Sequence, residues 1–236
     1  MVYAPVRCRS ECKDNLRFCS RWSGRDTVKR AMARLGVVMD GSEAQGEKGS
    51  PERLLDLLAE DLDILFCGIN PALSAARSGH HFSNRNNRFW RALHLAEFTP
   101  HRIQPEDDHT ILLYGCGLTT AVERPTVKAS ELALHEYRAA AETLEEKVRR
   151  CRPRFLAFLG KPAFAALFNT RSVRWGRQEL TLGGAEVWVL PNPSGLNRAF
   201  TLDALVSAYR ELRKASQEAG SIPRSTWRRR SNCVES

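Results

Sequence analysis

Residues 62–71, LDILFCGINP, form a short apolar run that ends in a Gly-Ile-Asn-Pro turn. A run of this length is typical of a strand that is buried on both faces of a parallel sheet. Pro71 biases Asn70 toward an extended backbone, so we expect the Asn70 amide to project beyond the carboxyl end of this strand. Ligands of parallel α/β sheets bind at that end, which makes the turn a candidate functional loop.

The rest of the chain repeats this strand pattern between helical patterns. The other predicted strands are ILLYGCG (111–117), RFLAFLG (154–160) and the hairpin QELTLGGAEVWVLP (178–191), which turns at Gly183-Gly184. Helices are predicted at 86–98, 130–150 and 161–169, with one from Leu202 and one that begins at Ser50-Pro51-Glu52. Strands that alternate with helices predict an α/β fold, a three-layer sandwich around a central, largely parallel sheet.

Composition indicates one well-buried domain with basic extensions. The chain has 236 residues, 42% hydrophobic content and a formal charge of +9. We expect a flexible basic extension over 1–49, a folded domain over 50–215 and a basic tail over 216–236. The two extensions carry most of the excess charge, which suits an anionic polymer partner but also suits solvated tails without a partner.

The same composition argues against a membrane or secreted protein. No apolar run approaches the roughly 18–20 residues that span a bilayer, and the basic start lacks the apolar segment of a secretory signal. We therefore expect a cytoplasmic protein.

The seven cysteines do not follow a metal-binding pattern. Cys67, Cys116 and Cys151 lie in or beside apolar stretches and are expected to be reduced core thiols. The others include Cys8, Cys12 and Cys19, which cluster in a polar segment whose spacing matches no zinc pattern. An iron–sulfur or zinc site there is the less favoured alternative, so we expect no metal and no cofactor.

Two loops carry the candidate chemistry. In the first, the Asn70 amide can donate and accept at once, which suits a bound water or carbonyl; alternatively it bonds its own backbone. In the second, NPSGLNR (192–198), Leu196 either projects from the loop tip, as wedges that hold a duplex open do, or is tucked into the core. The residues alone do not decide between these alternatives.

The segment SGHHFSNRNNRFW (78–90) places aromatic rings among cations, a mixture that suits stacked bases and phosphates. We expect Trp90 to be a core residue of a helix. We expect His80 and His81 to face solvent or phosphate. Asp107 and Asp108 are expected to lie on the surface.

Four segments in order resemble the mismatch-specific uracil/thymine-DNA glycosylase family, in its bacterial branch. They are FCGINPALSAARSGHHFSNRNNRFW (66–90), CGLTTAVERPTVKA (116–129), FLGKPAF (158–164) and WVLPNPSGLNR (188–198). The resemblance covers roughly residues 61–215 and implies the fold of the uracil-DNA glycosylases. It also implies base excision from double-stranded DNA that carries a uracil-like lesion or a mispair. The bacterial branch implies a bacterial protein that meets this substrate at the nucleoid.

The resemblance assigns roles position by position. Asn70 is similar to the catalytic asparagine that positions the attacking water, and Phe82 to the aromatic ring that stacks on the flipped base. Ile69 and Ala75 would line the base pocket, and Asn192 would face the base carbonyl. The resemblance places the DNA-binding wedge at Ser194, Gly195, Leu196, Asn197 and Arg198.

Three departures bear on the range of bases. Ala72 stands where the family has glycine, Ala75 where the nearest bacterial members have serine, and Thr120 where they have lysine. We expect a glycosylase that favours mispairs with guanine and acts as a monomer. We expect it to be monofunctional, because neither loop places a lysine as a nucleophile. The alternative is a non-catalytic DNA-binding module on the same scaffold.

Overall fold

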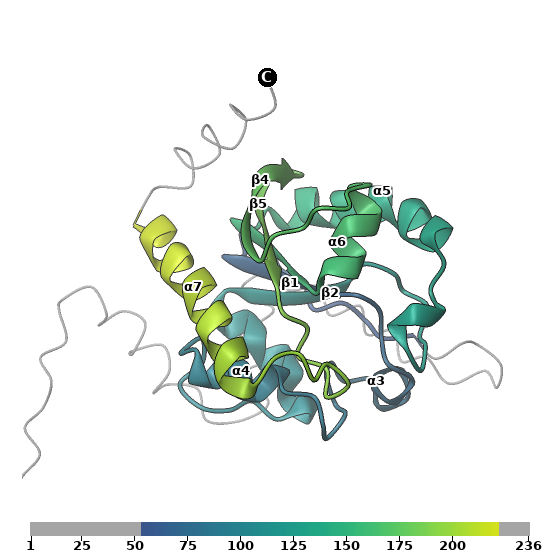
Figure 1. Cartoon of the computed structure of the whole chain (residues 1–236). Coiled ribbons are helices and arrows are strands. Elements are labelled where there is room, and N and C mark those ends of the chain that lie inside the picture. Colours follow the sequence, from purple (N-terminus) through teal and green to yellow (C-terminus); the bar gives the residue numbers. More distant parts are fainter. Residues whose placement is uncertain (1–52, 222–236) are drawn as a thin grey trace, which may run out of the picture. The chain divides into compact units, whose positions relative to one another are not determined.

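The computed structural model describes residues 53–221 (Figure 1). Its centre is a five-stranded sheet in the order β2-β1-β3-β5-β4. The strands are β1 (Ile64–Gly68), β2 (Cys116–Thr120), β3 (Phe155–Leu159), β4 (Gly176–Leu182) and β5 (Ala185–Leu190). All neighbours run parallel except β4, which pairs antiparallel with β5. The predicted α/β architecture is confirmed.

Strands β1, β2 and β3 differ from the edge strand β4 in burial. Every residue of β1, β2 and β3 is buried, as expected of strands covered on both faces. The edge strand β4 instead alternates between half-buried and exposed positions along its first half and carries Arg177 and Glu179. Charged side chains on an edge strand discourage pairing with another chain.

Helices cover both faces of the sheet. They are α3 (Leu73–Ser78), α4 (Phe89–Leu95), α5 (Leu134–Cys151), α6 (Lys161–Leu167) and α7 (Leu202–Gly220), with 3-10 segments η2 (Pro105–Tyr114) and η3 (Ala129–Glu131). The helices α4 and α7 pack together, as do α5 and α6. Figure 1 shows these pairs on opposite sides of the sheet.

Two predicted elements are wrong. Residues 53–58 are not helical; Leu57 instead exchanges two backbone hydrogen bonds with Leu118, at 2.8 and 2.9 Å. This pairing satisfies backbone groups of β2, which has no strand on its outer side. The apolar run at 111–117 also divides, because η2 continues to Tyr114 and the strand begins only at Cys116. Periodicity alone cannot separate a short buried helix from a strand.

Three further predictions concern the cysteines, the start of the C-terminal tail and membrane-spanning helices. Cys67, Cys116 and Cys151 are buried and free, as predicted, whereas Cys8, Cys12 and Cys19 lie outside the described residues. The predicted start of the C-terminal tail at 216 falls inside α7, which continues to Gly220. Between residues 53 and 221 no helix is both long and apolar enough to cross a membrane.

Candidate active site

A pocket of about 460 Å³ opens where the parallel strands end. Its walls come from the loop after β1, the start of α6 and the loop after β5. Most of the predicted site residues line it, namely Ile69, Asn70, Ala75, Phe82, Asn192, Ser194, Leu196 and Asn197. Gly195 and Arg198 are not among the lining residues. The fold thus brings together two loops that lie more than a hundred residues apart in sequence.

The amide of Asn70 is held in one orientation by the loop after β2. Its Nδ2 donates to the Arg124 carbonyl and to Thr126 Oγ1, both at 2.8 Å. These contacts use both amide hydrogens, and no described residue donates to Oδ1. The alternative in which Asn70 bonds its own backbone is therefore wrong. The arrangement leaves a fixed acceptor at the pocket wall.

The loop that holds Asn70 is itself anchored. Thr126 donates its backbone N–H to the Pro71 carbonyl at 3.1 Å, beside Asn70. Arg124 binds Glu136 through Nε and Nη2, at 2.6 and 3.0 Å. Hydrogen bonds from Arg124 lower the pKa of the Glu136 carboxyl to about 2, so this bidentate pair is charged at neutral pH. The anchor fixes the carbonyl that orients Asn70.

Phe82 forms a ring surface at the pocket. It stacks on Phe89 with a centroid distance of 4.0 Å and an interplanar angle of 25°. Its φ of 54° is a left-handed conformation that costs a bulky residue roughly 1–3 kcal/mol. Such a conformation persists only where neighbouring groups fix the chain.

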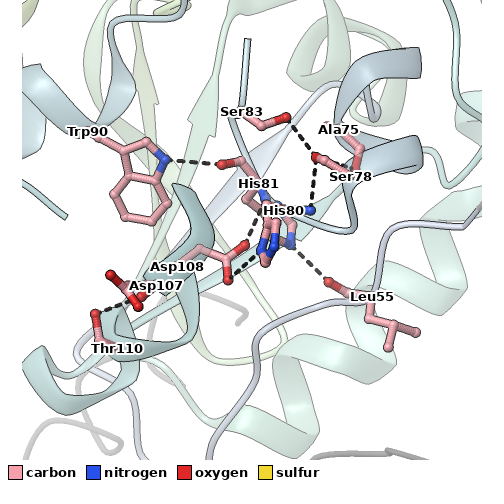
Figure 2. A network of polar contacts seen from close by, with 10 residues as sticks. All are labelled: Leu55, Ala75, Ser78, His80, His81, Ser83, Trp90, Asp107, Asp108 and Thr110. Carbon is pink, nitrogen blue, oxygen red and sulfur yellow. Dashed lines mark hydrogen bonds and ion pairs between the residues drawn. The ribbon is translucent and has the colours of Figure 1, made fainter. Parts of the chain in front are cut away.

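Figure 2 shows the groups that fix the chain before Phe82. The His81 N–H donates to Asp108 Oδ2 at 2.7 Å, and its carbonyl accepts from Trp90 Nε1 at 3.0 Å. Both peptide groups that flank His81 are thereby tied to buried side chains. Trp90 is a core residue, as predicted, and its indole N–H finds its partner in this network.

Two sequence predictions fail in this network. His81 is only 3% exposed and Asp108 only 5%, so neither lies at the surface. His80 is partly buried, with Nδ1 3.7 Å from Asp108 Oδ1. The sequence concealed this because a buried carboxylate that accepts a backbone N–H has the same local pattern as a surface run of acids.

His81 is neutral near neutral pH, because burial lowers its pKa. Its Nε2 lies 2.9 Å from the Leu55 carbonyl, which only accepts, so the single ring proton is on Nε2. That proton is already committed to Leu55. His81 therefore lines the pocket without serving as a proton donor through Nε2.

Arg88 ties the second loop to the first half of the chain. Its side chain donates to the carbonyls of Pro193, Ser194, Asn197 and Phe200, at 3.4, 2.9, 2.8 and 2.5 Å. Its backbone N–H donates to the Pro193 carbonyl as well, at 3.0 Å. The planar guanidinium can reach several carbonyls at once, which fixes the shape of the loop.

The tip of this loop projects from the protein. Leu196 is 75% exposed, so the alternative that places it in the core is wrong. Gly195 lies against Asn86; a Cβ there would fall 2.6 Å from the Asn86 carbonyl oxygen, so only glycine permits this approach. The loop therefore packs against Asn86 at Gly195, and the next residue, Leu196, projects outward.

Asn192 is also oriented by its own loop. Its Oδ1 accepts from the Ser194 N–H, and its carbonyl accepts from Asn197 Nδ2, both at 2.9 Å. No described residue accepts from its Nδ2. Gly160 lies beside Asn192 and Ile69 at the end of β3, and its φ of 122° is a backbone conformation that favours glycine. Asn192 can therefore offer a donor into the pocket.

The pocket holds few groups that could move a proton. Among the described residues that line it, the titratable ones are His81 and Lys128, and none is an Asp or Glu. Lys128 lies on the loop after β2 and was not singled out from the sequence. A site without a carboxylate base suits a reaction whose leaving group departs as an anion and whose nucleophile needs little activation.

A model of the family described as the uracil DNA glycosylase superfamily matches residues 55–213, more than half of the chain. The chain belongs to the uracil DNA glycosylase superfamily. The match includes both loops of the pocket. The solution NMR structure of a "putative Uracil DNA glycosylase" from Methanosarcina acetivorans is also similar, with 23% identity and a TM-score of 0.47. That similarity covers 69% of this chain and 98% of the archaeal one.

Sequence reasoning missed the residues of this superfamily member that orient others. Arg88, Arg124 and Asp108 act on backbone atoms or on a distant loop, and no local spacing reports such contacts. Thr126 lies in a segment that carried the resemblance, yet its contact with Asn70 spans 56 positions. The Asn70 amide needs acceptors for its two hydrogens. That need is the only signal in the sequence that could have suggested such partners.

Proposed function

We propose that this protein hydrolyses the N-glycosidic bond of uracil or a related base flipped from duplex DNA, as a step of base excision repair. The observation that carries the proposal is the orientation of Asn70. Both hydrogens of its amide are committed to Arg124 and Thr126, so Oδ1 is free to accept a hydrogen bond from a water in the pocket. A water held there would attack C1′ of the sugar.

The remaining pocket residues fit the other requirements of the reaction. A base must leave the duplex before it can be cleaved, which costs a few kcal/mol. Stacking on Phe82 would return roughly 1–3 kcal/mol of this cost. Asn192 Nδ2 would donate to a base carbonyl and stabilise the negative charge that develops as the base leaves. The positive charge on the sugar would be balanced by the phosphates of the DNA.

We further propose a monofunctional enzyme that prefers mispairs with guanine. A wobble pair is weaker than a Watson–Crick pair, so its base is easier to flip. The water-positioning geometry of Asn70 supports hydrolysis over attack by an amine, although Lys128 lines the pocket. Buried Ala75 and Thr120 stand beside the base site and would shape the range of bases.

The enzyme is proposed to act as a monomer, since both loops of the pocket come from one chain. We propose residues 50–215, extended to the end of α7, as the glycosylase domain. The basic segments 1–49 and 221–236 would add nonspecific affinity for DNA.

The rival proposal is a DNA-binding module without catalysis. Release of free uracil from duplexes with uracil opposite guanine or adenine separates the two. We expect release from both, faster opposite guanine, and no covalent complex when the reaction is treated with borohydride. Binding without any release would favour the rival, and a borohydride-trapped complex would overturn the monofunctional assignment.

A further inference from the structure

A partly exposed tryptophan has no role in the chemistry above. Trp175 precedes β4 and is 42% exposed. Its ring meets Phe200 edge-on, with centroids 5.1 Å apart. Lys161 Nζ lies 4.5 Å from the centroid of the indole. We call Lys161, Trp175 and Phe200 the aromatic ledge.

Two residues of the aromatic ledge belong to segments that also form walls of the proposed site. Lys161 begins α6 next to Pro162, which lines the pocket. Phe200 ends the loop that carries Leu196, and its carbonyl accepts from Arg88 Nη1 at 2.5 Å. A duplex that places its lesion in the pocket would therefore run close to the ledge.

Two hydrogen-bond donors on the ledge have no acceptor in the described part of the protein. Lys161 Nζ makes no ion pair there, and Trp175 Nε1 makes no hydrogen bond there. The segments that form the ledge, residues 160–175 and 191–200, contain Lys161, Arg171, Arg174 and Arg198 and no Asp or Glu; of these, Arg174 is paired with Glu179 of β4 at 2.8 Å. Unpaired donors on a basic surface complement an anionic ligand.

We propose that the aromatic ledge binds the phosphodiester backbone of the DNA strand beside the flipped nucleotide. Lys161 Nζ and Trp175 Nε1 would donate to phosphate oxygens, and the indole would pack against deoxyribose. Phosphate contacts of this kind set register on the duplex without reading sequence. The proposal rests on the proposed function, because it takes the pocket as the place of the lesion.

The test measures binding of the full-length protein to a duplex with a tetrahydrofuran abasic analogue, over a range of salt concentrations. Each phosphate contact adds about 0.9 to the slope of log K against log salt. We expect Lys161→Ala to flatten the slope by about 0.9 and Trp175→Ala to weaken binding severalfold. Trp175→Phe keeps a ring but lacks the N–H, so its binding should fall between those of wild type and Trp175→Ala.

Lys214→Ala is the matched control, because it removes the same charge from an exposed position on α7. Lys214 lies roughly 18 Å along that helix from its first residue. Its salt slope should stay close to that of wild type. Melting temperatures identify any variant that fails to fold; if Trp175→Ala does, Lys161→Ala and Trp175→Phe carry the test.

Slopes and affinities of the ledge variants equal to those of Lys214→Ala would overturn the inference. A change in oligomeric state with unchanged DNA binding would also overturn it and would point to a contact between copies of the chain. Uracil release by the wild type separates the two levels of the account. If wild type releases uracil and the ledge variants bind normally, only the ledge is wrong.

Discussion

Leu196 projects from its loop at the rim of the pocket, and it is 75% exposed. Exposure alone does not indicate a partner, but an apolar side chain at the tip of a loop that lines the pocket has the placement of a wedge. In DNA it would fill the gap left by the flipped base and slow the return of that base.

The substitution Leu196→Ala tests this role at the scale of one residue. We expect the melting temperature to change little, because an exposed leucine contributes little to folding, whereas truncation of a buried one costs roughly 2–5 kcal/mol. Single-turnover base release should fall more for uracil opposite adenine than for uracil opposite guanine, because the stronger pair depends more on the wedge. Equal losses on both duplexes would argue against the wedge.

At this scale the sequence identified loop residues whose side chains the fold gathers. Asn70, Phe82 and Asn192 all line one pocket, and their roles in catalysis and base binding stay predictions. Sequence reasoning failed where burial decides, since His81 and Asp108 are polar residues whose place in the core depends on partners from other elements. It also did not decide whether Leu196 is exposed or buried, because an apolar side chain in a loop can point to solvent or into the core.

The loop that follows β5 keeps its shape through Arg88. Four carbonyls of this loop accept hydrogen bonds from one guanidinium, and carbonyls carry no sequence signal. The Arg88 residue was visible in the sequence only as one of several cations near aromatic rings. Its partners belong to a segment more than a hundred positions away.

Arg88→Lys keeps the charge but loses the fork of donors that spans the carbonyls. If the substitution destabilises the ordered conformation of the loop by roughly 1.4 kcal/mol, activity on duplex DNA should fall about tenfold. Activity on single-stranded uracil DNA should change much less, because no wedge is needed there. Arg210→Lys is the control, since Arg210, in the middle of α7, also donates to a carbonyl, that of Leu95, at 2.9 Å. A similar fall on both substrates would mean that Arg88 supports the fold and not the wedge loop in particular.

The whole molecule places its site where parallel α/β sheets place ligands, beyond the carboxyl ends of the strands. This much followed from the apolar runs and their Gly- and Pro-containing ends, because strand period and loop chemistry are local. The pairing of Leu57 with Leu118 and the helical start of the 111–117 run did not follow. Both features depend on which backbone groups and apolar side chains of the folded sheet still need a partner or a cover, and this is not a local property of the sequence.

The central claim is that the Asn70 amide positions the attacking water. Its most direct test is single-turnover base release by Asn70→Ala on a duplex with uracil opposite guanine, alongside binding to the abasic analogue. We expect release to fall by several orders of magnitude while abasic-site binding stays close to wild type, because the amide positions water and does not hold the duplex. Release at the wild-type rate by a folded Asn70→Ala protein would contradict the account.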